Sequence, residues 1–182
     1  MNISEIITDM IDEDPTCRDL VTFLSMHAKG NVLHVGLCER TALASLLYGV
    51  ERNSGHVWAV CSVDAGAMAK LYFAPHAQFT LIESEDPTWD DPKKDGIPEE
   101  LDLIYVHSHP VKRDIPILLS LWGYRIKPSG MIVVLNVKAD PAIAKACEDY
   151  AKAVGMKFRV RQAQADLGVI YYPENKEVSQ NE

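Results

Sequence analysis

Two histidines, His107 and His109, stand together in the segment VHSHP and are the first candidates for chemistry. They end an apolar run, LDLIYVH, and in extended backbone residues i and i+2 point to the same side. One imidazole placed there can act as a general base that takes a proton from a substrate hydroxyl. Both together can bind a borderline transition metal such as zinc, iron or manganese. A purely structural role stays open, in which His107 is hydrogen-bonded at a strand end and His109 caps the turn before Pro110.

A second candidate is Gly36, which ends the apolar run NVLHVG. A glycine lets a strand turn tightly into the following helix, whose free backbone N–H groups attract a ligand. The next residues are Leu37-Cys38-Glu39-Arg40, so only the first glycine of the nucleotide-binding pattern G-x-G-x-x-G is present. A glycine needed merely for a tight turn explains Gly36 equally well.

Further polar residues follow the next strand candidates. Asp64 comes after HVWAVCSV, at about the spacing from the glycine turn at which an acid binds ribose hydroxyls in α/β folds. It could instead be the N-cap of the helical segment AGAMAKLYF. Ser84 and Glu85 follow QFTLIE, and Asn136 lies at the end of MIVVLNV. Asn136 together with the two histidines makes a candidate metal set.

These residues meet only if the strands are parallel, because ligands bind at the edge where the carboxyl ends of parallel strands lie. Short apolar runs rich in β-branched and aromatic residues alternate with helical patterns, which favours such a sheet. In the last helical pattern, Asp140 with Pro141 makes an N-cap and N1 pair, and Gly155 makes a C-terminal stop. The predicted strands span 31–36, 56–63, 78–83, 101–107, 131–137, 157–164 and 167–173.

The sequence therefore predicts an α/β fold: a Rossmann-like three-layer sandwich with a seven-stranded, mostly parallel sheet. The last two strands are joined by ADLG, which is too short for a crossover, so we expect an antiparallel C-terminal hairpin at one edge. The 182 residues suffice for one core and are too few for two ordinary domains. We expect an N-terminal helical extension at 1–30, the α/β domain at 31–173 and a flexible C-terminal tail at 174–182.

Charge and composition limit the classes of partner that we expect the protein to bind. The formal net charge is −8, of which −7 falls in residues 83–102, with nine acids against Lys93 and Lys94, and this segment is interpreted as a solvated surface loop. No basic stretch stands out, which disfavours nucleic-acid binding. No apolar run reaches the roughly 18 residues of a membrane span, and the acidic N-terminus is unlike a signal peptide, so we expect a cytoplasmic protein without a membrane partner. The four scattered cysteines are expected to be free thiols.

The order of elements resembles the class I S-adenosylmethionine-dependent methyltransferase superfamily. The segments VLHVGLCERTALASLL, VWAVCSVD, LDLIYVHSHP and RIKPSGMIVVLNV look like its small-molecule O-methyltransferase branch. The resemblance covers roughly residues 30–173, which makes 31–173 a methyltransferase-like domain. It implies S-adenosylmethionine as the cofactor and a small-molecule hydroxyl as the methyl acceptor.

The resemblance also assigns roles. Gly36 and Arg40 would lie at the methionine end of the cofactor, Asp64 at the ribose, and Ser84 and Glu85 beside the adenine. His107 or His109 would be the catalytic base.

Three departures from the family pattern bear on these roles. Arg40 stands where relatives usually have another glycine, and its guanidinium either binds the cofactor carboxylate, fills the space of the cofactor or points to solvent. His34 replaces the acid common two residues before Gly36. His107 replaces an aspartate of similar metal-dependent enzymes, so a magnesium site is not supported. A divalent transition metal bound by His107, His109 and Asn136 is the alternative to a catalytic role for the histidines.

These departures keep a second function open, namely a degenerate, non-catalytic protein of the methyltransferase fold that serves as a ligand-binding or interaction module. A metal-dependent hydrolase or oxygenase built on the two histidines is a third. The sequence leaves a homo-oligomer open.

Overall fold

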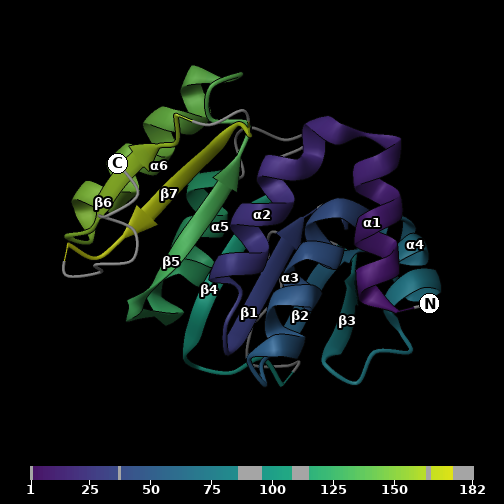
Figure 1. Cartoon of the computed structure of the whole chain (residues 1–182). Coiled ribbons are helices and arrows are strands. Elements are labelled where there is room, and N and C mark those ends of the chain that lie inside the picture. The colour runs from purple at the N-terminus through teal and green to yellow at the C-terminus, as the bar shows by residue number, and fades with distance from the viewer. Residues whose placement is uncertain (1, 37, 86–95, 108–114, 163–164, 174–182) are drawn as a thin grey trace.

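One sheet between two layers of helices makes up the fold (Figure 1). The computed structural model describes residues 2–36, 38–85, 96–107, 115–162 and 165–173. Within these ranges the sheet has seven strands. They are β1 (Asn31–Gly36), β2 (His56–Ser62), β3 (Phe79–Ser84), β4 (Leu101–His107), β5 (Ile126–Leu135), β6 (Lys157–Val160) and β7 (Leu167–Tyr171).

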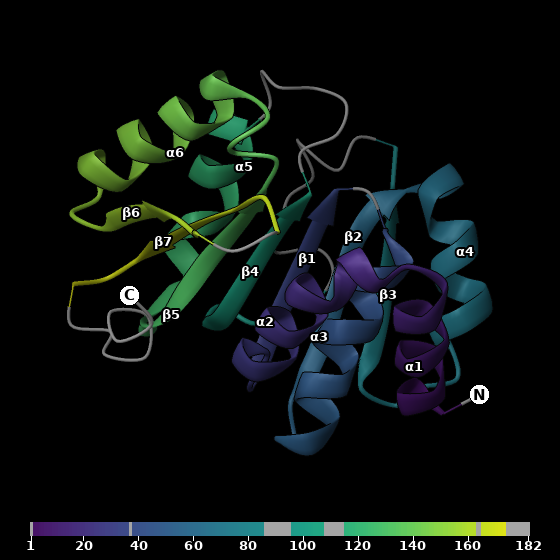
Figure 2. The same ribbon diagram turned by 45° about the horizontal axis from the view of Figure 1, so that its top comes forward.

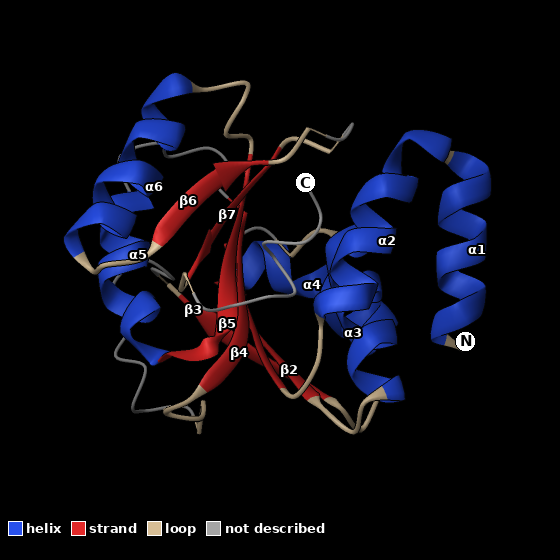
Figure 3. Cartoon of the chain, turned by 60° about the vertical axis from the view of Figure 1, so that its left-hand side comes forward, coloured by secondary structure: helices blue, strands red, loops and turns tan. Residues whose placement is uncertain are grey.

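The helices divide between the two faces of the sheet (Figure 3). They are α1 (Ile3–Glu13), α2 (Arg18–His27), α3 (Arg40–Arg52), α4 (Val63–Phe73), α5 (Ile115–Trp122) and α6 (Pro141–Ala153). The buried side chains of α1 to α4 share one apolar cluster, and those of α5 and α6 share another on the opposite face. None of the described helices is long and apolar enough to cross a bilayer.

The strand order is β3-β2-β1-β4-β5-β7-β6. The first five strands are parallel, and β7 runs antiparallel to both β5 and β6. The predicted α/β fold with an antiparallel C-terminal hairpin is therefore confirmed. Chain order reverses beside β1, and in open α/β sheets ligands bind at the carboxyl edge next to such a switch point.

The two predicted N-terminal helices are present and pack onto α3 (Figure 2). Asn2 and Glu5 form a reciprocal capping box that starts α1. Ile6 and Leu24 are completely buried in the cluster that also contains the apolar side chains of α3. Residues 2–28 thus extend the helical layer on one face of the sheet.

The second strand ends one residue earlier than predicted, because α4 begins at Val63. The hydroxyl of Ser62 accepts a hydrogen bond from the Ala65 N–H at 3.4 Å and caps the helix. Asp64 therefore does not cap α4, which answers one of the alternatives for this residue. It lies in the first helical turn, where a carboxylate is favoured by the helix dipole.

The acidic segment 83–102 is not a solvated loop at its ends. Asp102 lies in β4, where its carboxylate accepts from the Asn31 N–H at 2.7 Å and from the Lys127 ammonium at 3.0 Å. Glu83 lies in β3 and pairs with Lys70 of α4. The central residues, 86–95, fall outside the described ranges. The prediction of a solvated loop, which rested on charge density alone, was therefore wrong for Glu83 and Asp102.

Gly36 is required by the backbone where β1 meets β4. Its φ is +111°, and a Cβ at this position would lie 2.4 Å from the main-chain oxygen of His107. The two residues are register partners in the sheet. By contrast, Gly155, which follows α6 as predicted, has φ +75° and open space around it.

We predict that Gly36→Ala destabilises the protein more than Gly155→Ala does. Both substitutions strain the backbone by about 1–2 kcal/mol, but only Gly36→Ala also drives a methyl group into the His107 carbonyl, which brings the total cost above about 3 kcal/mol. Urea unfolding of the two variants measures the difference. Equal losses of unfolding free energy would contradict the close approach of β1 and β4.

Candidate functional site

The carboxyl ends of the five parallel strands bring most of the predicted site residues to one edge. Gly36, Ser84 and His107 are the last residues of β1, β3 and β4. Glu85 follows β3 and is exposed, whereas Ser84 is buried inside the strand instead of following it. Asn136 follows β5 with φ +64°. His109 lies outside the described residues.

Arg40 is the first residue of α3, and its side chain is directed to the helices around it. The guanidinium lies 3.8 Å from the Glu13 carboxylate of α1 and 4.9 Å from the ring centre of Tyr72 in α4. Its side chain is 30% exposed. Of the three outcomes that the sequence left open, this geometry is closest to an arginine held at the helical surface by a neighbouring acid and an aromatic ring.

Asp64 is exposed and makes none of the hydrogen bonds or ion pairs found among the described residues. With Ser62 as the cap, the carboxylate is available at the carboxyl edge, one helical turn from the end of β2. This placement is compatible with binding of ribose hydroxyls.

Glu39 is the residue that sequence reasoning missed. Its carboxylate oxygen Oε2 lies 3.4 Å from Nδ1 of His107. The two side chains come from the turn after β1 and from the end of β4 and are 36% and 11% exposed. Burial raises the pKa of the Glu39 carboxyl. Only the pairing of β1 with β4 brings the two residues together, so no local signal reveals the contact.

His34 and Tyr105 lie behind this pair, on the same face of the sheet. They are register partners in β1 and β4, both are fully buried, and their ring centres are 5.3 Å apart. Neither nitrogen of His34 nor the Tyr105 hydroxyl has a hydrogen-bond partner in the described structure. Burial, reinforced by nearby His107, lowers the pKa of His34 to about 3, so its ring is neutral. Burial and the Glu39 charge raise the pKa of Tyr105.

Two cysteines expected only to be free thiols also meet at this edge. Cys38 lies in the turn after β1, and Cys61 lies in β2, one residue beyond the last β1–β2 pair. The interaction between their thiols raises the pKa of Cys38 and lowers that of Cys61. All four cysteines are free, as expected.

Among the described residues no cluster of three or more histidine, cysteine, aspartate or glutamate side chains is arranged to hold a metal ion. The proposed set of His107, His109 and Asn136 includes His109, which lies outside the described ranges. The metal alternative therefore stays a prediction.

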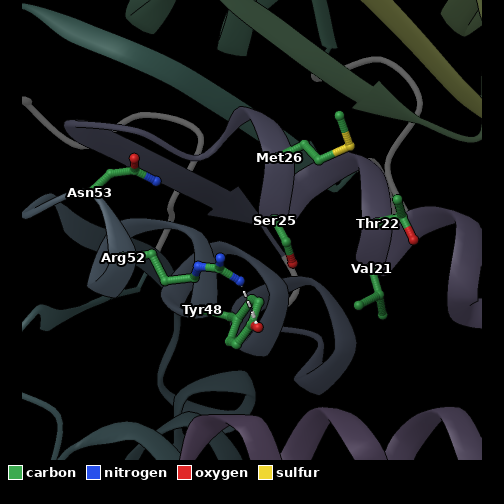
Figure 4. Close-up of a pocket in the computed structure, with 7 residues that line it drawn as sticks. All are labelled: Val21, Thr22, Ser25, Met26, Tyr48, Arg52 and Asn53. Atoms are coloured by element: carbon green, nitrogen blue, oxygen red, sulfur yellow. Dashed lines mark hydrogen bonds between the residues drawn. The ribbon is translucent and has the colours of Figure 1, made fainter.

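A hollow of about 520 Å³ lies elsewhere, between α2 and the end of α3 (Figure 4). Its lining includes Met26 and Arg52, and the Arg52 guanidinium donates to the Tyr48 hydroxyl at 2.8 Å. These residues lie just before β1 and β2 begin, at the amino edge of the sheet. The hollow contains none of the predicted site residues.

Solved structures with the same arrangement of strands and helices include methyltransferases. An O-methyltransferase from Bacillus cereus in complex with SAH is 12% identical and superposes with a TM-score of 0.61, covering 92% of this chain and 88% of that one. The SAH-bound methyltransferase PaMTH1 from Podospora anserina is 12% identical with a TM-score of 0.61, at 85% and 76% coverage. This is the class I S-adenosylmethionine-dependent methyltransferase fold.

Human N-acetylserotonin methyltransferase in complex with SAM has the same methyltransferase fold, at 13% identity and a TM-score of 0.61. The match covers 94% of this chain and 56% of the human one. No protein-family model and no curated protein sequence matches the chain.

We predict that His34 makes the stability of this methyltransferase-fold protein depend on pH. The unfolded chain takes up a proton on His34 near its ordinary pKa of 6.5, whereas the folded protein does so only near 3. The contribution of the neutral ring is therefore complete above pH 6.5 and is lost as the pH falls toward 3, by up to about 1.4 kcal/mol per pH unit.

His34→Leu should remove this part of the pH dependence of the free energy of unfolding, because leucine cannot take up a proton. It should cost little stability near neutral pH, since the ring nitrogens have no partners to lose. Urea unfolding at about pH 7.5 and about pH 5 compares the two proteins, and wild type should lose about 2 kcal/mol more than the variant between them. Equal losses would show that His34 titrates normally in the folded state.

Proposed function

We propose that the chain is an S-adenosylmethionine-dependent methyltransferase that acts on a small-molecule hydroxyl. One observation carries the proposal: Gly36, the last residue of β1 before the turn at which we place the cofactor, is paired in the sheet with His107, the candidate base. This proximity supports the proposal, because methyl transfer to a hydroxyl requires a methyl donor and a proton acceptor next to each other.

The turn after β1 fits an anionic ligand. Helix α3 is 13 residues long and begins without a side-chain cap, because the Glu39 side chain makes no capping hydrogen bond. The N–H groups of its first turn are therefore left for another acceptor, and the helix dipole favours a negative charge there. Gly36 lets the backbone leave β1 tightly, and the cofactor carboxylate is the group we assign to these amides.

When bound, the cofactor supplies an electrophilic methyl group on sulfonium. His107 accepts the proton of the acceptor hydroxyl as the new bond to carbon forms, which keeps charge from building on the oxygen. Asp64 would hold the ribose hydroxyls, and Ser84 and Glu85 would lie beside the adenine. His109 is the second candidate for the base.

Titration calorimetry with S-adenosylmethionine and S-adenosylhomocysteine tests the cofactor half of the proposal. We expect Asp64→Ala to weaken binding about 10- to 150-fold, as loss of hydrogen bonds to a charged group does. Asp12→Ala, an exposed acid of α1, is the matched control and should bind like wild type. Full affinity in Asp64→Ala would reject the ribose assignment.

Arg40→Ala and His107→Ala separate the remaining roles. Arg40 contacts Glu13 and Tyr72, so its removal should leave affinity nearly unchanged. His107→Ala should retain the cofactor and, with a hydroxyl acceptor found by screening, lose about 10²- to 10⁴-fold in rate.

The second candidate function is a non-catalytic module of the same fold, favoured by the presence of an arginine where relatives have glycine. Binding by Arg40→Ala but not by wild type would mean that the arginine closes the pocket. Absence of binding by both proteins would favour the non-catalytic module over the methyltransferase.

A further inference from the structure

The contact between Glu39 and His107 joins the cofactor turn to the candidate base. The carboxylate Oε2 and the imidazole Nδ1 are 3.4 Å apart, longer than a good hydrogen bond and within ion-pair distance. Catalytic hydrogen bonds are often long in unliganded proteins and tighten when ligand binds. The pair is thus placed to form such a bond without moving either backbone segment far.

Glu39 has no competing use in the described structure. Its Oε2 is buried and makes no hydrogen bond at standard geometry. The adjacent cation, Arg40, is held by Glu13 and Tyr72. Although Glu39 stands at the N-cap position of α3, its side chain does not cap the helix. Its carboxylate can therefore be changed without removing a helix cap.

Glu39 places a charged group beside His107, whereas two other described neighbours, Tyr105 and His34, are held uncharged. Tyr105 of β4 presents its ring to His107 at 6.5 Å between ring centres, and its phenol stays protonated because of burial. His34 of β1 stays neutral for the same reason. A carboxylate that accepts from Nδ1–H leaves Nε2 as the basic nitrogen and stabilises the imidazolium that forms when Nε2 takes a proton.

The same turn is held to His107 a second time, through the main chain. Gly36 has no room for a Cβ against the His107 oxygen, and the two residues are paired in the sheet. Gly36 is anchored in this way, whereas Glu39 lies three residues further along, at the N-cap position of α3. A ligand bound at the start of α3 can therefore change the distance between Glu39 and His107 while Gly36 stays paired.

We propose that Glu39 is a positioning residue that holds His107 in the Nδ1–H tautomer and makes the basicity of His107 depend on whether the cofactor turn is occupied. The second half rests on the proposed function, whereas the first half concerns the free protein alone. His107 would then reach its full basicity only when the methyl donor occupies the turn.

Nuclear magnetic resonance of the full chain labelled with ¹⁵N-histidine tests the positioning half without any substrate. His107→Gln assigns the His107 signals among the six histidines. In wild type we expect the Nδ1–H tautomer, and in Glu39→Gln we expect a mixture of tautomers and a His107 titration midpoint lower by about one pH unit. Glu39→Asp should restore part of the shift.

Glu13→Gln is the matched control, because it removes the carboxylate that pairs with Arg40 and leaves Glu39 in place. It should not move the His107 signals. An unchanged tautomer and midpoint in Glu39→Gln would overturn the positioning role, whether or not the protein binds a cofactor.

Addition of S-adenosylhomocysteine tests the coupling. It should shift the His107 midpoint in wild type by more than in Glu39→Gln, at saturation in both proteins. Equal shifts would overturn the coupling. Absence of binding to wild type would overturn the proposed function and the coupling with it, while the spectra of the free protein still decide the tautomer.

Discussion

The approach of β1 to β4 at Gly36 and His107 is the constraint on which the rest of the site depends. The strands pair in parallel, and at their last register pair a main-chain oxygen occupies the space of a Cβ. Backbone packing this tight leaves the following turn little freedom in where it begins. The start of the turn and the backbone of His107 are therefore positioned by one contact.

Polar side chains accumulate behind that contact, on a sheet face that is otherwise apolar. His34 and Tyr105 are fully buried without hydrogen-bond partners in the described structure. Each unsatisfied group costs about 1–3 kcal/mol, and large aliphatic side chains would have packed there at no such cost. Departures of this kind from ordinary core composition cluster at functional sites. These groups are held uncharged, whereas Glu39 places a carboxylate 3.4 Å from the His107 ring.

The location of the candidate site was predicted from local sequence patterns, whereas the contacts within it were not. Apolar runs of strand length showed where Gly36 and His107 end their strands, and the parallel arrangement then placed them at one edge. Glu39 was missed because its contact, His107, lies on another strand, and only the pairing of β1 with β4 brings the two side chains together. Cys38 and Cys61 were missed as a pair because 23 residues separate them and only the order of β1 and β2 brings their thiols together.

Asp64 and Asp102 show the same difference between what local sequence predicts and what tertiary contacts determine. The sequence predicted the end of the strand to within two residues of Asp64. The Ser62 hydroxyl, which caps α4, determines where the strand ends and the helix begins. Asp102 belongs by composition to an acidic segment, yet three elements meet at its carboxylate. A charge count cannot distinguish a solvated acid from one that accepts buried N–H groups, since the difference lies in what the fold brings to it.

By itself the sequence determined the α/β fold, the order of strands and helices and the candidates at the carboxyl edge, because hydrophobic periodicity and turn residues are local properties that the chain carries along its length. The tertiary structure alone decided that Arg40 turns to Glu13 and Tyr72, that Glu39 meets His107 and that His34 is held neutral. These outcomes depend on distances and burial between residues of different elements, and such distances exist only once the strands have paired and the helices have packed.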